Sequence, residues 1–310
     1  MHTLKMKKIL ITGANGLLGQ KLVSLLSKQQ HVNLLATAKG ICRFSLPDNV
    51  VYCTLDITNA DACNNLLNEF QPDALIHTAA MTQVDDCEDE REICDLINVT
   101  GVSNLIKAIR NRNTHFVHIS TDFIYEGDEE EYFEDSKVNP LSYYGSSKWK
   151  SEQLFKQVLF PYSILRTVLV YGVLQDLSRS NIVLWAKSAL EKGEKINVVN
   201  DQYRCPTLAE DLAYACLQVI QENVTGIYHV SGKDFLSILD LVFEIADYWD
   251  FDKSLINSIS SDSLNQKARR PLKTNLNLSK AKQGFNYQPI SFREGLKLLD
   301  EQIKKIKLKE

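Results

Sequence analysis

The sequence lacks the features of several protein classes. None of its apolar runs approaches the roughly 20 residues that a helix needs to span a bilayer. The basic opening of the chain leads into a short apolar run that Thr12, Gly13 and Asn15 interrupt, so we expect no signal peptide. Its 35 lysines and arginines are set against 39 aspartates and glutamates, a balance that gives no reason to expect a nucleic-acid partner.

Paired cysteines and clustered histidines are also missing. The seven cysteines include no C-x-x-C spacing, which fits a reducing compartment and small buried thiols. His115 and His118 are three residues apart in an expected strand, so they point to opposite faces. We therefore expect a cytoplasmic protein with no membrane partner and no metal site.

The N-terminal segment has the pattern of a strand, a glycine turn and a helix. Residues 7–12 form a short apolar run, G-A-N-G-L-L-G occupies 13–19, and leucines then recur at nearly helical spacing. The three glycines allow a tight turn, close approach of a pyrophosphate and close packing of helix on strand, with the phosphate at the helix N-terminus. The alternative is a plain glycine turn. We expect a dinucleotide to contact Gly13, Asn15, Gly16, Leu17, Leu18 and Gly19.

The residues after the second expected strand, 32–38, bear on the choice between NADH and NADPH. A protein that binds NAD usually places a carboxylate there to hold the ribose 2′-hydroxyl, but no acidic residue occurs between Gly19 and Pro47. Lys39 and Arg43 follow the strand instead, and cations suit a 2′-phosphate. We therefore expect NADPH, with NADH as the alternative cofactor. The simpler interpretation is a pair of solvated surface cations.

Further apolar runs alternate with helical patterns and predict an α/β fold, a doubly wound parallel sheet of the Rossmann type. These runs are 50–56, 74–80, 115–120 and 162–172. Ligands bind at the carboxyl ends of parallel strands, where the chain places Asp56, the small residues Ala79 and Ala80, and Thr121. Asp56 can reach an adenine amino group, and Asn98 on a following helix is expected beside the cofactor.

The regular alternation ends near Gly172. A chain of 310 residues, of which 44% are hydrophobic, can form one large domain or two coupled ones. We expect residues 1–172, with a returning segment at about 196–230, to form the cofactor domain. Residues 173–195 and 231–310 would form a smaller C-terminal α/β domain, with the substrate in the cleft between the two. Further helices are expected at 143–158, 180–192, 208–221, 237–249 and 291–306.

A tyrosine and a lysine follow the fifth strand at helical spacing. In N-P-L-S-Y-Y-G-S-S-K, Ser142 can cap a helix that carries Tyr144 and Lys148 on one face. A neighbouring ammonium lowers the pKa of a phenol, which is about 10 in a free tyrosine, so the pair can exchange a proton with an oxygen on a reacting carbon. Thr121 can hydrogen-bond the same oxygen. Taken alone, the spacing is also typical of two surface residues.

In order and spacing, the motifs resemble those of extended short-chain dehydrogenases/reductases, and among them the dTDP-4-dehydrorhamnose reductase-like family. The matching stretches run nearly from end to end of the chain: G-A-N-G-L-L-G (13–19), L-D-I-T (55–58), H-T-A-A-M-T-Q-V-D-D-C-E (77–88), S-T-D-F-I-Y-E-G (120–127), Y-F-E-D (132–135) with P-L-S-Y-Y-G-S-S-K (140–148), L-R-T-V-L-V-Y-G (165–172), D-Q-Y-R-C-P-T (201–207) and R-P-L-K-T-N-L (270–276).

The resemblance implies an NADPH-dependent reductase of a 4-keto-6-deoxy sugar nucleotide. Tyr144 would donate the proton, Lys148 would lower the pKa of Tyr144 and hold the nicotinamide ribose, and Thr121 would complete the catalytic set. Ile57 and Met81 join the expected cofactor contacts. The implied substrate contacts are Thr82, Val84, Asp85, Thr121, Asp122, Leu169, Arg204 and Arg270.

Two positions depart from the family pattern, both on the substrate side. Leu169 stands where rhamnose-forming reductases usually have a tryptophan, and Arg204 replaces the glycine of D-Q-x-G-x-P-T. The form Q-x-R-x-P-T also resembles the regulatory β subunit of methionine adenosyltransferase, so a non-catalytic NADP-binding subunit is a second hypothesis. A sugar-nucleotide epimerase or dehydratase is the third, although Phe123 stands where related dehydratases have a glutamate. A homodimer is the assembly we consider.

Overall fold

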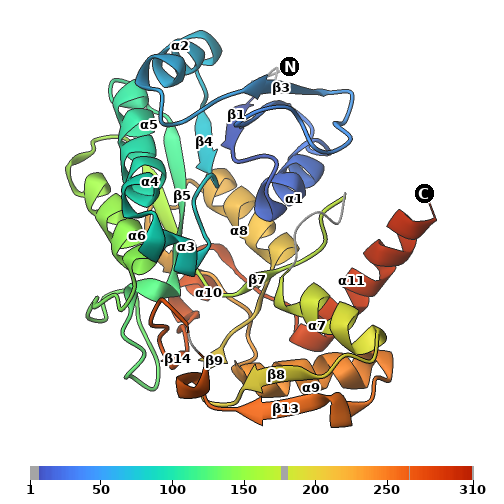
Figure 1. Cartoon of the computed structure of the whole chain (residues 1–310). Helices are drawn as coiled ribbons and strands as arrows, with labels where there is room; N and C mark the ends of the chain where they lie inside the picture. The colour runs from blue at the N-terminus through green and yellow to red at the C-terminus, as the bar shows by residue number, and fades with distance from the viewer. Residues whose placement is uncertain (1–6, 176–180, 265, 309–310) are drawn as a thin grey trace.

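A sheet of seven parallel strands forms the centre of the molecule, in the order β11-β6-β5-β4-β1-β2-β3 (Figure 1). The computed structural model describes residues 7–175, 181–264 and 266–308, so the start of the chain and residue 180, where a helix is predicted to begin, lie outside it. The strands are β1 (Lys7–Thr12), β2 (Val32–Ala38), β3 (Val50–Thr54), β4 (Ala74–His77), β5 (His115–Thr121), β6 (Tyr162–Thr167) and β11 (Gly226–His229). The order reverses between β1 and β4, which confirms the predicted doubly wound fold.

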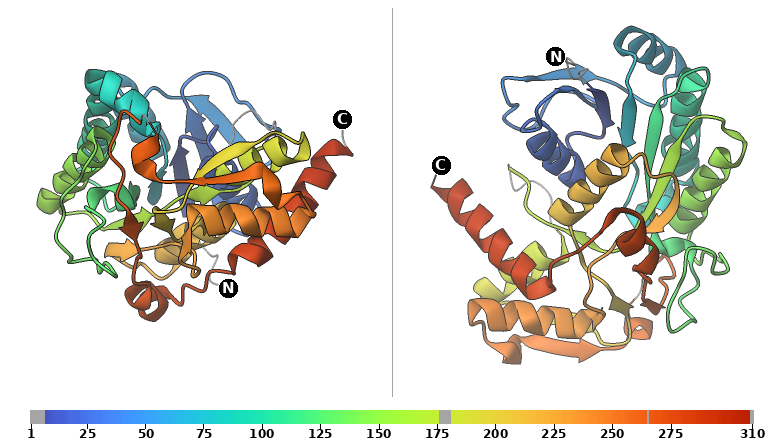
Figure 2. Two further views of the ribbon diagram at one scale, coloured as in Figure 1. Left: turned by 60° about the horizontal axis from the view of Figure 1, so that its bottom comes forward. Right: turned by 180° about the vertical axis from the view of Figure 1, so that it is seen from behind.

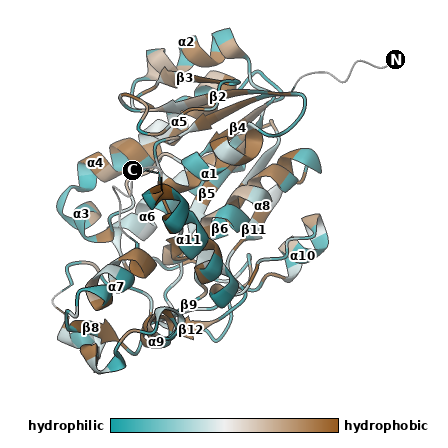
Figure 3. Cartoon of the chain, turned by 90° about the vertical axis from the view of Figure 1, so that its right-hand side faces the viewer, coloured by the Kyte–Doolittle hydropathy of each residue, from teal (hydrophilic) through white to brown (hydrophobic). Residues whose placement is uncertain are grey.

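Side chains of the strands enter two cores, one on each face of the sheet. In β1, Ile9 and Ile11 join the core that α1 (Leu17–Leu26) and α8 (Ala209–Gln221) cover, whereas Leu10 joins the opposite core. Because both faces are buried, the strands read as nearly continuous apolar runs. Figure 3 shows β2 and β3 hydrophobic along most of their length.

Helices on the second face are α2 (Ala60–Phe70) and α5 (Gly101–Ile109), which pack against each other. The predicted helical segments are found here, and Asn59 caps α2 by accepting a hydrogen bond from the Ala62 amide. A short π-helical turn, η1 (Leu96–Thr100), precedes α5 and was not predicted. Turns of this kind are frequent at functional sites.

The smaller part of the chain forms a separate core below the sheet in Figure 1 (Figure 2 gives two other views). It consists mainly of three helices and a pair of parallel strands. They are α7 (Ile182–Glu191), α9 (Ile238–Trp249), α11 (Phe292–Lys307), β8 (Ile196–Val199) and β13 (Ile256–Ile259). Since β8 pairs with β13, the chain returns to the central sheet only with α8 and β11, later than the predicted start of the returning segment at 196.

Short strands join the two parts near the carboxyl ends of the main sheet. β7 (Val170–Tyr171) pairs with β10 (Thr207–Leu208). β9 (Tyr203–Arg204) lies between β12 (Leu236–Ser237) and β14 (Lys273–Thr274). The motifs at 201–207 and 270–276 are therefore neighbours in space, as their positions on β9 and β14 require.

Helix α6 (Tyr143–Gln153) starts where the sequence predicts, with Ser142 accepting a hydrogen bond from the Gly145 amide. It ends earlier than predicted, because residues Leu154–Gln157 tighten into a 3₁₀ turn, η3. Within the described residues, no helix combines the length and the apolar character needed to cross a bilayer.

A buried ion pair anchors the end of α6 to the sheet. Arg166 of β6 contacts both carboxylate oxygens of Glu152, with Nη2 2.8 Å from Oε2, and both side chains are at most 2% exposed. The Nη1 group of Arg166 also donates to the Tyr125 hydroxyl at 2.7 Å and to the Glu134 carbonyl at 2.8 Å. The guanidinium therefore joins α6, β6 and the loop that follows β5.

We predict that Glu152→Leu lowers the free energy of unfolding by about 3–5 kcal/mol, because it leaves the Arg166 charge buried without its carboxylate. Denaturant titration followed by circular dichroism measures the loss. The matched control is Glu152→Leu/Arg166→Met, which removes both charges and should recover most of the stability. A single variant within about 1 kcal/mol of the parent protein would contradict the assigned role.

Candidate active site

The glycine turn between β1 and α1 has the geometry of a phosphate-binding turn. Gly13 has a φ of +75°, and a Cβ on it would lie 2.6 Å from the Ala79 amide nitrogen. A Cβ on Gly19 would lie 2.3 Å from the Gly13 carbonyl oxygen, whereas one on Gly16 would meet only that oxygen, at 3.2 Å. Gly16 therefore leaves room for a ligand at the start of α1, where no side chain caps the helix and no acidic residue occupies the first turn.

Asn15 organises the loop that follows β2. Its side chain donates to the Ile41 carbonyl at 2.9 Å and accepts from the Arg43 amide at 3.0 Å. Lys39 is exposed and forms an ion pair with Asp56 at 2.9 Å, so these two expected cofactor residues lie together. The structure thus brings Lys39, Arg43 and Asp56 to one edge of the turn, which fits a nucleotide that carries an extra phosphate.

The side chains of two expected cofactor residues, Leu18 and Ile57, lie in the hydrophobic cores. Leu18 belongs to the core under α1, and Ile57 packs over Gly101, where an added Cβ would lie 2.6 Å from its Cδ1. Leu17 is half-buried and approaches Gly172. Ala79 and Ala80 are half-buried just past β4, where small side chains leave space beside the turn.

The three expected catalytic residues meet at the end of β5. Thr121 is its last residue, and its hydroxyl lies beside the phenol of Tyr144 on α6. Lys148 lies one turn further along α6 and donates from Nζ to the Ile119 carbonyl at 2.7 Å. All three side chains are buried. The arrangement places a hydroxyl, a phenol and an ammonium beside one another at the carboxyl edge of the sheet.

Burial controls the protonation of the catalytic pair. It raises the pKa of Tyr144 well above the ordinary value, although the neighbouring Thr121 hydroxyl acts in the opposite direction. Burial also lowers the pKa of Lys148 to about 8, against an opposing effect of Glu152. The net shift of the pKa of Tyr144 is upward because desolvation is the largest cause, and the lowering effect expected of Lys148 stays a prediction.

The side chain of Asn98 is buried and forms hydrogen bonds with other groups of the protein. Its amide oxygen accepts from the Met81 amide at 2.9 Å, and its amide nitrogen donates to the Met81 carbonyl at 3.0 Å and to the Ser147 hydroxyl at 2.9 Å. The buried side chain lies on η1 and holds the loop after β4 against α6. Ser147, which the sequence analysis did not select, could have been recognised by its position one turn after Tyr144.

The remaining loop residues differ in exposure. Thr82 is exposed and Val84 is half-buried at the start of α3 (Val84–Asp89). Asp85 of the same helix receives both terminal nitrogens of Arg270, the closer at 2.7 Å, and also accepts from the Ala268 amide at 3.0 Å. Two residues expected to bind substrate thus bind each other and connect the loop after β4 with the C-terminal part of the chain.

Arg204 is buried in the structure and holds the chain around Asp122. Its Nη2 donates to the Pro271 carbonyl at 2.5 Å, and its Nη1 donates to the Tyr203 and Leu272 carbonyls at 2.8 and 3.1 Å. Its Nε lies 3.5 Å from the Asp122 carboxylate. The Arg204 side chain is only 4% exposed and donates to acceptors of the protein itself. It therefore holds together the segments that surround Asp122.

Asp122 and Leu169 complete this side of the site. Asp122 is buried and accepts from the Thr274 hydroxyl at 2.6 Å and from the Thr121 hydroxyl at 3.2 Å. Leu169 has a φ of +44°, an uncommon value for a branched side chain. Its carbonyl accepts from the Thr207 amide at 3.2 Å. Strained positions of this type cluster at functional sites, which fits the location of Leu169 between β6 and β7.

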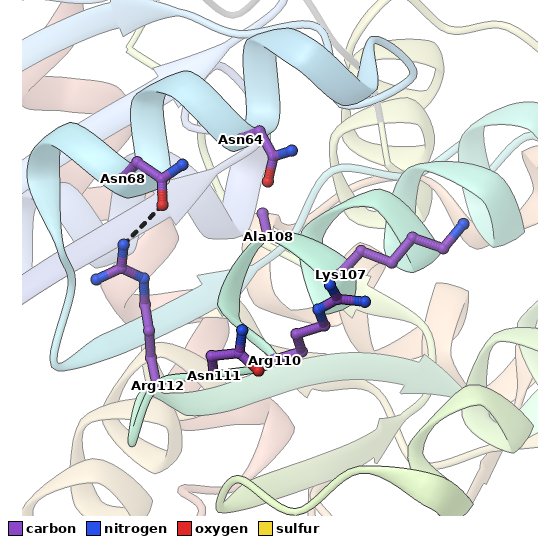
Figure 4. Close-up of a pocket in the computed structure, with 7 residues that line it drawn as sticks. All are labelled: Asn64, Asn68, Lys107, Ala108, Arg110, Asn111 and Arg112. Atoms are coloured by element: carbon purple, nitrogen blue, oxygen red, sulfur yellow. Dashed lines mark hydrogen bonds between the residues drawn. The ribbon is translucent and has the colours of Figure 1, made fainter.

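A surface groove of about 620 Å³ lies at the opposite edge of the sheet, between α2 and the end of α5 (Figure 4). Its lining residues are Asn64, Asn68, Lys107, Ala108, Arg110, Asn111 and Arg112. Arg112 donates to the Asn68 side chain at 2.7 Å. The groove is separate from the catalytic residues, and its cations complement the carbonyl ends of the two helices.

The fold and the site define the class first: a Rossmann-fold protein in which Thr121, Tyr144 and Lys148 meet at the carboxyl end of β5. The chain belongs to the family described as the RmlD substrate binding domain, whose model matches residues 6–304. It is 31% identical over 304 residues to a dTDP-4-dehydrorhamnose reductase of Aggregatibacter actinomycetemcomitans, covering 94% of this chain and 98% of that protein. Methionine adenosyltransferase 2 subunit beta of Xenopus tropicalis is 28% identical over 301 residues, covering 95% of this chain and 87% of that protein.

Solved structures agree with this assignment. A dTDP-4-dehydrorhamnose reductase from Clostridium acetobutylicum superimposes with a TM-score of 0.84 at 30% identity, covering 96% of this chain and 99% of that chain. A dTDP-4-dehydrorhamnose reductase from Bacillus anthracis, in complex with NADP, gives a TM-score of 0.82 at 29% identity, covering 96% and 100% of the two chains. The whole chain therefore shares its architecture with these reductases.

We predict that Lys148→Met raises the thermal unfolding midpoint below pH 8, because burying the Lys148 charge destabilises the folded state. The lysine has a pKa of about 8 when folded and 10.5 as the reference value, so the folded state loses its proton first as the pH rises. The advantage of the variant should shrink as the pH rises from 8 towards 10.5.

Thermal unfolding followed by circular dichroism across this pH range tests the prediction. The matched control is Lys150→Met, which changes a lysine on the same helix whose ammonium pairs with Asp95 at 2.8 Å. A Lys148→Met protein that is less stable than the parent at every pH would show that the charge of Lys148 does not destabilise the folded state.

Proposed function

We propose that this protein is an NADPH-dependent reductase of a 4-keto-6-deoxy sugar nucleotide, of the dTDP-4-dehydrorhamnose reductase type. The observation that carries the proposal is the buried phenol of Tyr144, which lies beside Thr121 at the carboxyl end of β5 and one helical turn from Lys148. Membership of the reductase family and the NADP complex of the Bacillus anthracis relative support it.

The residues of the turn fit a phosphorylated dinucleotide. The space beside Gly16 and the uncapped start of α1 suit a pyrophosphate, and the small residues Ala79 and Ala80 leave room along the end of β4. Lys39 and Arg43 are exposed cations at the edge of the turn, where a 2′-phosphate would lie. When bound, NADPH supplies the hydride for reduction of a keto carbon.

Tyr144 supplies the proton for this reduction. Its raised pKa keeps the phenol protonated, so it is ready to protonate the oxygen on which negative charge develops. The Thr121 hydroxyl can donate a hydrogen bond to the same oxygen. Lys148 is charged below its pKa of about 8 and stabilises the phenolate that Tyr144 becomes, while the Ile119 carbonyl fixes its ammonium.

A non-catalytic NADP-binding subunit is the second candidate, because the chain also matches the methionine adenosyltransferase β subunit of Xenopus tropicalis. The buried arginine at position 204, in place of a glycine, is the feature that favours it. The two candidates differ in turnover. NADPH oxidation measured with a panel of 4-keto-6-deoxy sugar nucleotides supports the reductase if any substrate is turned over, and favours the subunit if NADPH binds without turnover.

We predict that Tyr144→Phe lowers kcat by about 10²–10⁴-fold, because the variant keeps the ring and loses the proton. NADPH binding, measured by fluorescence titration, should change little. The control is Tyr143→Phe, which removes a hydroxyl bonded to Asp95 at 2.8 Å on the adjacent, outward position of α6. Turnover by Tyr144→Phe at the parent rate would exclude Tyr144 as the proton donor.

We further predict that Arg43→Ala weakens NADPH binding by about tenfold or more, the scale of one charge-assisted hydrogen bond to the 2′-phosphate. NADH binding should be nearly unchanged, since NADH has a hydroxyl at that position. Arg110→Ala, in the groove at the other edge of the sheet, is the control for a general loss of positive charge. An equal effect of Arg43→Ala on both nucleotides would contradict the assignment.

A further inference from the structure

Two of the seven cysteines lie together directly behind Tyr144. Cys87 is on α3 and Cys94 is on α4 (Arg91–Asp95), and both thiols are fully buried. They share a small core with Tyr144. The half-buried side chains around this core are Met81, Val84, Phe123 and Tyr143.

Both sulfurs also contact the groups that position the catalytic helix. The Cys87 thiol donates to the Met81 carbonyl at 3.8 Å, and the Cys94 thiol donates to the Ser147 hydroxyl at 3.3 Å. The Asn98 amide donates to the Cys94 sulfur at 3.4 Å. Each thiol is therefore bonded to the same network that holds the loop after β4 against α6.

The two thiols differ in acidity. The neighbouring Cys87 thiol lowers the pKa of Cys94, against the effect of burial and with help from Ser147 and Asn98. The pKa of Cys87 is raised, first by the neighbouring Cys94 thiol and then by burial. A thiolate is the nucleophilic form, so Cys94 is the residue that reacts first.

We propose that Cys87 and Cys94 form a redox-active dithiol that hydrogen peroxide converts to a disulfide, and that the disulfide displaces the network around Asn98 and lowers activity at Tyr144. The reagent must be of about the size of water, because both sulfurs are buried behind half-buried side chains. A bulky disulfide such as oxidised glutathione should react far more slowly.

The chemistry balances with one molecule of peroxide. The Cys94 thiolate attacks a peroxide oxygen, the O–O bond breaks, and the departing hydroxide takes a proton to leave as water, which gives a sulfenic acid on Cys94. The Cys87 sulfur then attacks the Cys94 sulfur, the S–O bond breaks, and the hydroxyl leaves as a second water with the Cys87 proton. Two electrons pass from the sulfurs to the peroxide.

The new bond must disturb the site, because a disulfide holds its sulfurs about 2.05 Å apart. At that separation at least one sulfur moves away from its present partner, either the Met81 carbonyl or the Ser147 hydroxyl. Met81 lies in the loop beside the cofactor turn, and Ser147 is one turn from Tyr144. Oxidation should therefore impair the site and thiol reduction should restore it.

The test begins with the whole protein treated with hydrogen peroxide, denatured, alkylated, digested and mapped by mass spectrometry. We expect a peptide pair joined through Cys87 and Cys94 that disappears after dithiothreitol. The mapping needs no substrate, so its result is independent of the proposed reductase function. Recovery of both cysteines as alkylated thiols, while the half-buried Cys42 or Cys53 is oxidised, would overturn the proposal.

Function is then followed by NADPH binding and by NADPH oxidation with a keto-sugar nucleotide. We expect peroxide to reduce at least one of them severalfold in the parent and in Cys53→Ser, with recovery in dithiothreitol. Cys87→Ser should resist this reversible loss, and a cooperative thermal unfolding transition is the check that this variant folds. Formation of the 87–94 disulfide with both readouts unchanged would refute its effect on the site.

Discussion

Helix α6 is held on the sheet by polar contacts, and the candidate active site depends on them. Four of its side chains reach three other elements. Ser147 accepts from Asn98 on η1, Lys148 donates to Ile119 on β5, Ser151 bonds His118 on β5, and Glu152 pairs with Arg166 on β6. These residues and Tyr144 recur at the spacing of one helix face. Because hydrogen bonds are directional, they fix the rotation and the register of α6 in a way that an apolar stripe does not.

The polar character of these α6 contacts also explains which parts of the structure could be predicted from the sequence. The strands and the helices α1, α2, α5, α8, α9 and α11 were predictable because their apolar periodicity records their burial. The buried face of α6 has no such periodicity, so its contacts with Asn98 and Arg166 were not recognised. Tyr144 and Lys148 were found by their chemistry and spacing, but the sign of the pKa shift of Tyr144 depends on burial, which spacing does not report.

The substrate side was the least predictable part, because it is assembled from distant segments. Asp85 meets Arg270 across 185 positions, and Arg204 meets Pro271 across 67. In the sequence, Arg204 is a cation at a glycine position and suggests a ligand contact. In the structure Arg204 is buried and donates to the carbonyls of Pro271 and Leu272. The local sequence pattern gives no sign that this distant segment lies beside it. A buried charge of this kind is tolerated only when its hydrogen-bond donors have acceptors. Four acceptors surround the guanidinium of Arg204 and meet this requirement.

The electrostatics of the site keep the phenol of Tyr144 protonated. Burial makes the phenolate of Tyr144 costly, so the resting side chain carries its proton and is prepared to give it to an alkoxide, which is a still stronger base. Oxidation of an alcohol would need the phenolate before the reaction starts. The charge of Lys148 can balance a phenolate once it forms, but only below a pKa of about 8, where the phenol itself is fully protonated. The same desolvation that weakens Tyr144 as an acid thus sets the protonation state of the phenol before any reaction.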